Sequence, residues 1–86
     1  MKSDFEIRIA KKLKSLRAGE GLNQDQIAEK CGIDISTVVR YENNNVSMNF
    51  GTLSKFLDFY DYSIYSFFEE IIAKWHKENE KKNQSN

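Results

Sequence analysis

A short stretch near the middle of the chain carries side chains that suit nucleic-acid binding. Ser36 and Thr37 have hydroxyls that can bond to base edges or phosphates, and Arg40 follows Ser36 by one helical turn. A guanidinium at that place can pair with guanine or clamp a phosphate, and Ile35 can cover a thymine methyl group. On one exposed helical face, these residues predict contact with double-stranded DNA.

The remaining residues offer little for catalysis or metal binding. His76 is the one histidine and has no neighbour at metal-ligand spacing, and Cys31 is the one cysteine and occupies a predicted core position. No set of acids, histidine or nucleophile is large enough for an active site, and no glycine-rich phosphate loop occurs. We therefore expect no enzyme, no cofactor, no metal ion and no small-molecule effector.

The composition is typical of one small cytoplasmic domain. The chain has 86 residues, of which 40% are hydrophobic and 30% charged. No apolar run approaches the ~20 residues of a membrane span, and the N-terminus lacks the apolar core of a signal peptide. The 13 basic and 13 acidic residues give a net charge of zero. This balance argues against a nonspecific nucleic-acid binder but permits a sequence-specific one.

The hydrophobic pattern predicts an all-α protein with five helices. Apolar residues recur at helical spacing, no stretch alternates like a strand, and proline is absent. The apolar stripe of the last helix stops at Trp75, so residues 1–76 are predicted as the domain and 77–86 as a polar, solvated tail. The predicted helices cover Asp4–Ala18, Asn23–Cys31, Ile35–Glu42, Phe50–Tyr60 and a segment that follows Ser63.

The second and third predicted helices are joined by a tight turn. Gly32 can supply the positive φ that the turn needs, and the small Ala28 lets the two helices approach closely. Ile33 and Val38 can fill the wedge between them. Two short helices around such a turn are typical of a helix-turn-helix, whose second helix can enter a major groove about 12 Å wide.

The segment Leu22–Asn43 resembles the Cro/phage-repressor-type helix-turn-helix family. The agreement falls on residues that define the family pattern, namely Gln24, Ala28, Gly32, Val38 and Glu42. The resemblance implies a compact five-helix, lambda-repressor-like DNA-binding domain with the helix-turn-helix at its second and third helices. It also implies that Arg17 and Glu42 form a partly buried structural ion pair.

The resemblance and the residue chemistry together define a predicted DNA-binding surface. In the family the residue at Gln24 reaches a phosphate and braces the recognition helix, and Asn23 can both cap its helix and offer an amide to the DNA backbone. The polar run after the third helix suits backbone contacts as well. The predicted DNA-binding residues are Asn23, Gln24, Ile35, Ser36, Thr37, Arg40, Asn43, Asn44 and Asn45.

The aromatic fifth helix has two interpretations. Its stripe could belong to the core and cover the first and fourth helices, or it could join two copies of the chain. So many aromatic residues exceed what a small domain can hide, and aromatic side chains are enriched at interface centres. We expect a homodimer whose interface contains Tyr62, Tyr65, Phe68, Ile72 and Trp75.

The predicted function is therefore that of a homodimeric transcriptional regulator that binds operator half-sites. The length and the segment Tyr62–Ile72 look like restriction–modification controller proteins, while a phage-type repressor and an antitoxin that represses its own operon remain open. A protein–protein module on the same fold is a further alternative, favoured by the net neutrality and by the single basic residue on the recognition helix. A steep fall of DNA affinity with salt would exclude that module.

Overall fold

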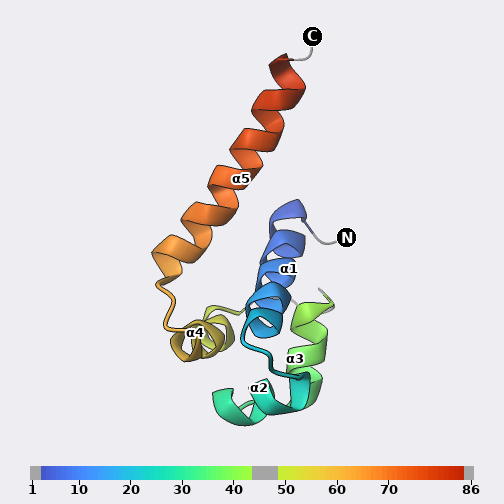
Figure 1. The fold of residues 1–86 in the computed structure, drawn as a ribbon, viewed down its shortest axis with the longest axis vertical. Coiled ribbons are helices and arrows are strands. Elements are labelled where there is room, and N and C mark those ends of the chain that lie inside the picture. The colour runs from blue at the N-terminus through green and yellow to red at the C-terminus, as the bar shows by residue number, and fades with distance from the viewer. Residues whose placement is uncertain (1–2, 44–48, 85–86) are drawn as a thin grey trace.

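The computed structural model describes residues 3–43 and 49–84, which form five helices and contain no strand (Figure 1). The all-α prediction is therefore confirmed for this part of the chain. The helices are α1 (Asp4–Gly19), α2 (Gln24–Cys31), α3 (Ile35–Glu42), α4 (Phe50–Phe59) and α5 (Ile64–Gln84). None of the described helices is long and apolar enough to cross a membrane.

Side-chain caps fix where most of the helices begin. The Ser3 hydroxyl accepts from the backbone N–H of Glu6 at 3.1 Å, while the Glu6 carboxylate accepts from the backbone N–H of Ser3. The Asn49 side chain caps α4 by accepting from the backbone N–H of Thr52 at 3.1 Å.

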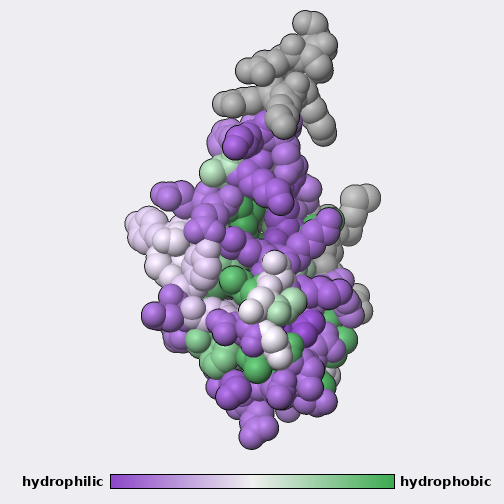
Figure 2. Space-filling model, in the orientation of Figure 1, coloured by the Kyte–Doolittle hydropathy of each residue, from purple (hydrophilic) through white to green (hydrophobic). Residues whose placement is uncertain are grey.

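The core lies where α1, the helix-turn-helix, α4 and the start of α5 converge. Each element contributes apolar residues at helical spacing, so one face is buried and the other stays polar. Figure 2 shows the hydrophilic residues that cover one side of the molecule and leave only small hydrophobic patches. The most deeply buried side chains are Leu13, Ile27, Val38, Leu53, Phe56, Leu57 and Phe67.

The fifth helix differs most from its prediction. It continues as helix to Gln84, through most of residues 77–86 that the sequence predicted as a polar, solvated tail, and its far end projects beyond the other helices (Figure 1). Lys, Glu and Gln favour helix without needing a core, which accounts for the extra turns. The stripe itself divides, because Phe67 and Ile71 are buried while Ile72 and Trp75 are exposed.

Candidate nucleic-acid interface

A network of hydrogen bonds to the buried Glu42 holds α3 in place on its inner side. The Arg17 Nε donates to Glu42 Oε2 at 2.8 Å, and the Gln24 amide donates to Glu42 Oε1 at 3.1 Å. A further Arg17 nitrogen donates to the carbonyl of Leu22 at 2.7 Å. The Glu42 side chain is only 1% exposed, so its charge depends on these donors. The hydrogen bond to Glu42 also raises the pKa of Arg17.

The network joins three separate elements. Arg17 belongs to the last turn of α1, Gln24 begins α2, and Glu42 ends α3. Both carboxylate oxygens of Glu42 are therefore tied to groups that come earlier in the chain, which fixes the end of α3 relative to α1 and α2. Gln24 thus braces α3 through its amide, and Arg17 and Glu42 lie together as an ion pair.

The turn between α2 and α3 has the geometry that its glycine permits. Gly32 has φ 68°, and the backbone N–H of Ile33 donates to the carbonyl of Ala28 at 3.0 Å. Val38 is fully buried beneath the turn, and Ala28 is 5% exposed. Asp34 occupies the N-cap position of α3, yet its side chain makes no capping hydrogen bond.

The outer face of α3 carries the residues that the sequence singled out. Ile35, Ser36 and Arg40 are exposed, and Arg40 Nε donates to the Ser36 carbonyl at 3.4 Å. Thr37 is half-buried and instead lines a shallow cleft that includes Lys55 of α4. The structure therefore places three of the four predicted readers on one open helical face.

The predicted backbone contacts lie at the two ends of the helix-turn-helix. Asn23 is the N-cap of α2, where its side chain accepts from the backbone N–H of Gln26 at 2.8 Å and its backbone N–H donates to the Gln26 side chain at 2.9 Å. Asn43 is exposed at the C-cap of α3. Asn44 and Asn45 lie outside the described residues.

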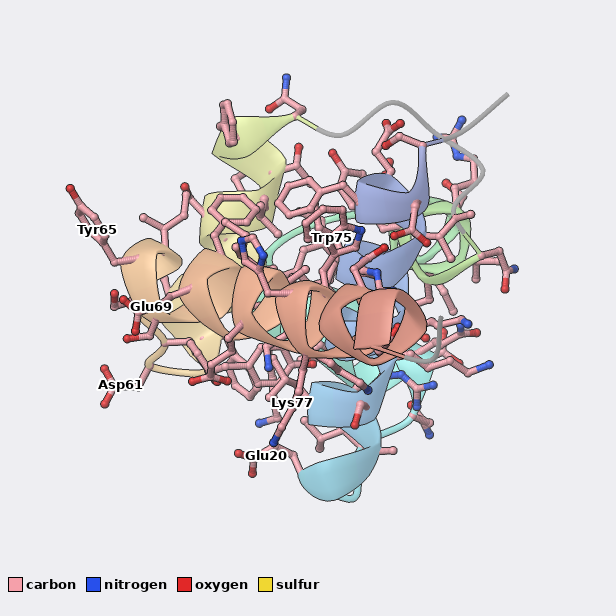
Figure 3. All side chains as sticks on the ribbon, turned by 90° about the horizontal axis from the view of Figure 1, so that it is seen from above. Glu20, Asp61, Tyr65, Glu69, Trp75 and Lys77 are labelled. Atoms are coloured by element: carbon pink, nitrogen blue, oxygen red, sulfur yellow. The ribbon has the colours of Figure 1, made fainter. Side chains whose placement is uncertain are left out.

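A separate apolar groove runs along α5 and is bordered by Phe50 at the start of α4. Its volume is about 800 Å³, and its exposed edge includes Phe50 at 71% and Tyr65 at 85% exposure. Trp75 lies beside it, next to the first turn of α1, where a smaller hollow also contains Ile72 (Figure 3). The groove is lined by Phe50, Ile64, Tyr65, Phe68, Glu69, Ile72, Ala73 and His76.

The predicted dimer residues do not all lie in this groove. Tyr65, Phe68 and Ile72 line it, but Tyr62 belongs to a cluster on another side of α5. The Tyr62 hydroxyl donates to Glu70, which raises the pKa of this tyrosine, and its ring stands edge-on to a buried phenylalanine. Sequence reasoning missed Phe50, because its spacing with Leu53 is that of a core residue.

The sequence model of the family described as "Helix-turn-helix" matches residues 13–67 of this chain. The match spans more than half of the 86 residues, and the chain belongs to this helix-turn-helix family. It begins in α1 and ends early in α5, so it includes the polar network and the exposed face of α3. No curated protein sequence matches the chain.

Solved structures of one restriction-modification controller protein, C.Esp1396I, share the fold. The wild-type protein aligns with a TM-score of 0.77 and 22% identity over 88% of this chain and 99% of that chain. Its tetramer with a natural 35 base-pair operator aligns with a TM-score of 0.75 and 22% identity over 84% and 95%. Its complex with a 25 base-pair operator site gives 0.73 and 22% over the same shares. At this identity the likeness establishes the fold.

Proposed function

We propose that this protein is a sequence-specific regulator that binds double-stranded DNA as a homodimer on repeated half-sites. The observation that carries the proposal is the open face of α3, which presents Ile35, Ser36 and Arg40 from a helix held by the buried Glu42. A rigid helix with exposed readers is what major-groove recognition requires. The similar controller protein occurs in complexes with its operator, which supports the same use of this fold.

Each residue of this surface has a proposed role. Arg40 pairs with guanine or a phosphate, Ser36 bonds to a base edge or a phosphate, and Ile35 covers a thymine methyl group. The other proposed contacts position the protein on the DNA backbone. These are Asn23 and Gln24 at the start of α2, Thr37 beside the readers, and Asn43, Asn44 and Asn45 after α3.

Genomic selection of bound DNA fragments tests this function directly. The expected product is one sequence motif present as two related half-sites. Affinity for that motif should fall steeply with salt, because phosphate contacts release counterions. Failure to recover any motif would contradict DNA binding and would favour a protein–protein module on the same fold.

The second copy of the chain is proposed to dock on the groove of α4 and α5. The groove is apolar at its centre, and Glu69 and His76 lie one above the other along the same side of α5. A two-fold axis that crosses α5 near Ala73 would place each Glu69 beside the partner's His76, where an imidazole N–H can donate to the carboxylate. The small Ala73 would let the two helices approach closely.

Two identical substitutions separate dimerisation from DNA binding. Ile72 is 44% exposed in the groove and Ile35 is 42% exposed on α3, so a glutamate costs each site similarly in the monomer. Ile72→Glu should give monomers in sedimentation, whereas Ile35→Glu should remain dimeric and lose operator binding. Trp75→Glu provides a second disruption of the groove's edge. A dimer that persists in both Ile72→Glu and Trp75→Glu would place the interface elsewhere.

Within the class of regulators, we propose a controller-type role. The likeness covers 99% of the wild-type controller protein, so the five helices of this chain correspond to that whole protein. Genes for a methyltransferase and an endonuclease beside this one would support the role. A toxin gene or a prophage in that place would favour an antitoxin or a phage-type repressor instead.

A further inference from the structure

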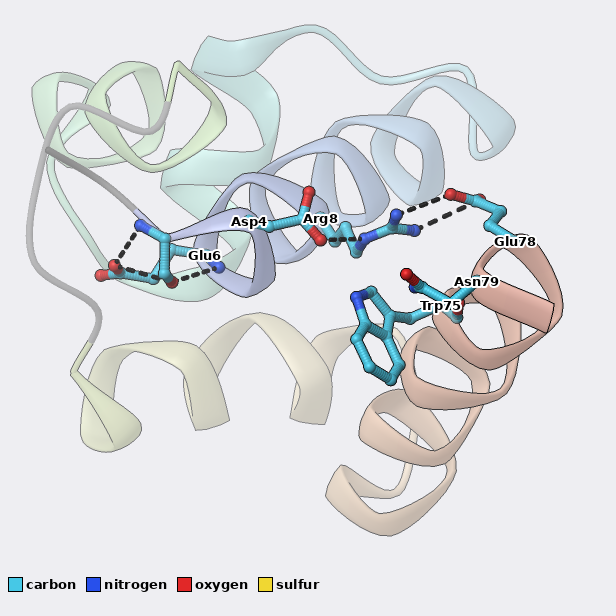
Figure 4. A network of polar contacts seen from close by, with 7 residues as sticks. Asp4, Glu6, Arg8, Trp75, Glu78 and Asn79 are labelled. Carbon is cyan, nitrogen blue, oxygen red and sulfur yellow. Dashed lines mark hydrogen bonds and ion pairs between the residues drawn. The ribbon is translucent and has the colours of Figure 1, made fainter. Parts of the chain in front are cut away.

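The distal part of α5 is joined to α1 by an ion-pair cluster. One terminal nitrogen of Arg8 donates to Glu78 Oε1 at 2.6 Å, and the other donates to Glu78 Oε2 at 3.3 Å (Figure 4). The Nε of the same guanidinium donates to Asp4 at 2.7 Å. We call these three residues the distal clasp. A guanidinium that donates to carboxylates on two sides is held in one orientation. An ammonium group with a single contact would not be held in this way.

A second clasp joins the same two helices closer to the core. Lys12 Nζ lies 2.9 Å from Glu70 Oε1, and the Tyr62 hydroxyl donates to the same carboxylate. Along α5, Glu70 and Glu78 are about 12 Å apart, at 1.5 Å per residue. One attachment would let α5 pivot about the core, but two attachments at this separation fix its angle to α1.

The clasps and the groove lie on different faces of α5. Glu70, Lys74 and Glu78 follow one another at intervals of four residues beside α1, whereas Phe68, Ile72 and His76 form a stripe on the nearly opposite side, along the groove. A partner docked in the groove therefore leaves the clasps intact. In such a dimer, the angle of α5 to each body determines where the two α3 helices lie relative to each other.

A small change in this angle has a large effect on DNA. If each recognition helix lies about 17 Å from the dimer contact, measured at right angles to the DNA and roughly the radius of a small domain, a tilt of about 5° moves it by about 1.5 Å along the DNA. Two-fold symmetry doubles the change in separation to about 3 Å, which is close to the ~3.4 Å between successive base pairs. A modest loosening of α5 is therefore equivalent to changing the half-site spacing by one base pair.

We propose that the distal clasp of Asp4, Arg8 and Glu78 positions α5 so that the dimer selects one operator half-site spacing. This inference rests on the proposed homodimeric DNA binding. Arg8 and Glu78 are positioning residues, since they act through the angle of α5 and lie on a different element from the reading face. They affect which half-site spacing the dimer binds, whereas α3 determines which bases it binds.

The test is a competitive selection from DNA that carries two copies of the selected half-site with the spacing varied one base pair at a time. Wild-type protein should prefer one spacing. Glu78→Gln and Arg8→Gln should each reduce the preference for that spacing over its neighbours by about 1.5-fold to fivefold, the range expected when one exposed ion-pair contact is lost. Sedimentation should show that both variants remain dimers.

Two controls distinguish positioning from a general loss of charge or fold. Glu20→Gln removes the same charge from an exposed residue at the far end of α1 and should keep the wild-type spacing profile. The charge-reversed variant, Arg8→Glu with Glu78→Arg, should restore much of the preference when Asp4→Asn is added, because Asp4 would otherwise repel the new carboxylate one turn away. Identical profiles for wild type and the single variants would overturn the proposal, as would single variants that become monomeric. A wild-type protein that selects no DNA would instead contradict the proposed function.

Discussion

The helix-turn-helix and the groove of α4 and α5 differ in whether their side chains find partners within one copy of the chain. Around α3, the buried Glu42 finds partners for both carboxylate oxygens within the same chain. Along the groove, large apolar side chains such as Tyr65 of α5 and Phe50 of α4 are exposed to solvent. The first region is complete in one copy of the protein. The second exposes apolar and aromatic side chains, and we propose that a second copy of the chain covers them.

The largest effect should come from breaking the buried pair. Arg17→Met leaves the Glu42 charge, 1% exposed, without its main partner, and should lower the free energy of unfolding by about 3–5 kcal/mol. Urea denaturation measures the loss. Arg8→Met removes an arginine from the exposed ion pair with Glu78 and should have a much smaller effect. Equal losses in the two variants would contradict the expectation that the buried Arg17–Glu42 pair stabilises the fold more than the exposed Arg8–Glu78 pair does.

The next effect tests the exposed face of α3, which the buried Glu42 network holds in place. Arg40→Ala should weaken operator binding by about 1–3 kcal/mol, because it removes a cation that can pair with guanine or a phosphate. Titration of the operator followed by fluorescence anisotropy measures the change. Lys74→Ala removes the same charge from α5 and should bind almost as well as the wild type. Unchanged affinity in Arg40→Ala would remove this residue from the proposed surface.

A smaller effect is expected at the turn between α2 and α3. A Cβ at Gly32 would meet no atom within 4 Å, so Gly32→Ala carries only the cost of φ 68° in a residue with a side chain. That cost is about 1–2 kcal/mol of unfolding free energy. Gly19→Ala, at the end of α1 and also in open space, should be neutral or slightly stabilising. Thermal melting of the pair gives the difference. A stabilised Gly32→Ala variant would refute this account of the turn.

The two regions also differ in how far the sequence could predict them. Helix caps and the Gly32 turn are local, so residue types a few positions apart were enough to place Asn23 and Gly32 correctly. The exposed face of α3 followed from its helical spacing. The division of the α5 stripe could not be predicted, because it depends on where α1 and α4 pack. Phe50 has the spacing of a core residue, yet it lies at the open edge of the groove.

The position of Tyr62 could not be predicted from the sequence either. This residue leads to the smallest predicted effect, a change in how folding stability depends on pH. The Tyr62 hydroxyl and then the Lys12 ammonium lower the pKa of Glu70 below its ordinary value of 4.5. A carboxylate whose pKa is lower in the folded state contributes stability above the unfolded pKa, and this contribution is lost as the pH falls through the folded value. Acidification from about pH 5 downwards should therefore destabilise the wild type more than Glu70→Gln.

Unfolding free energies measured at intervals between neutral and acidic pH test this difference. Glu29→Gln is the matched control, since Glu29 is an exposed glutamate on α2, away from both the Tyr62 cluster and the groove. It should follow the wild-type curve. Parallel curves for wild type and Glu70→Gln would show that the Tyr62 cluster contributes nothing to folding. Converging curves at low pH would assign Tyr62 to the closed, intramolecular part of the protein and leave the dimer face to Tyr65, Phe68 and Ile72.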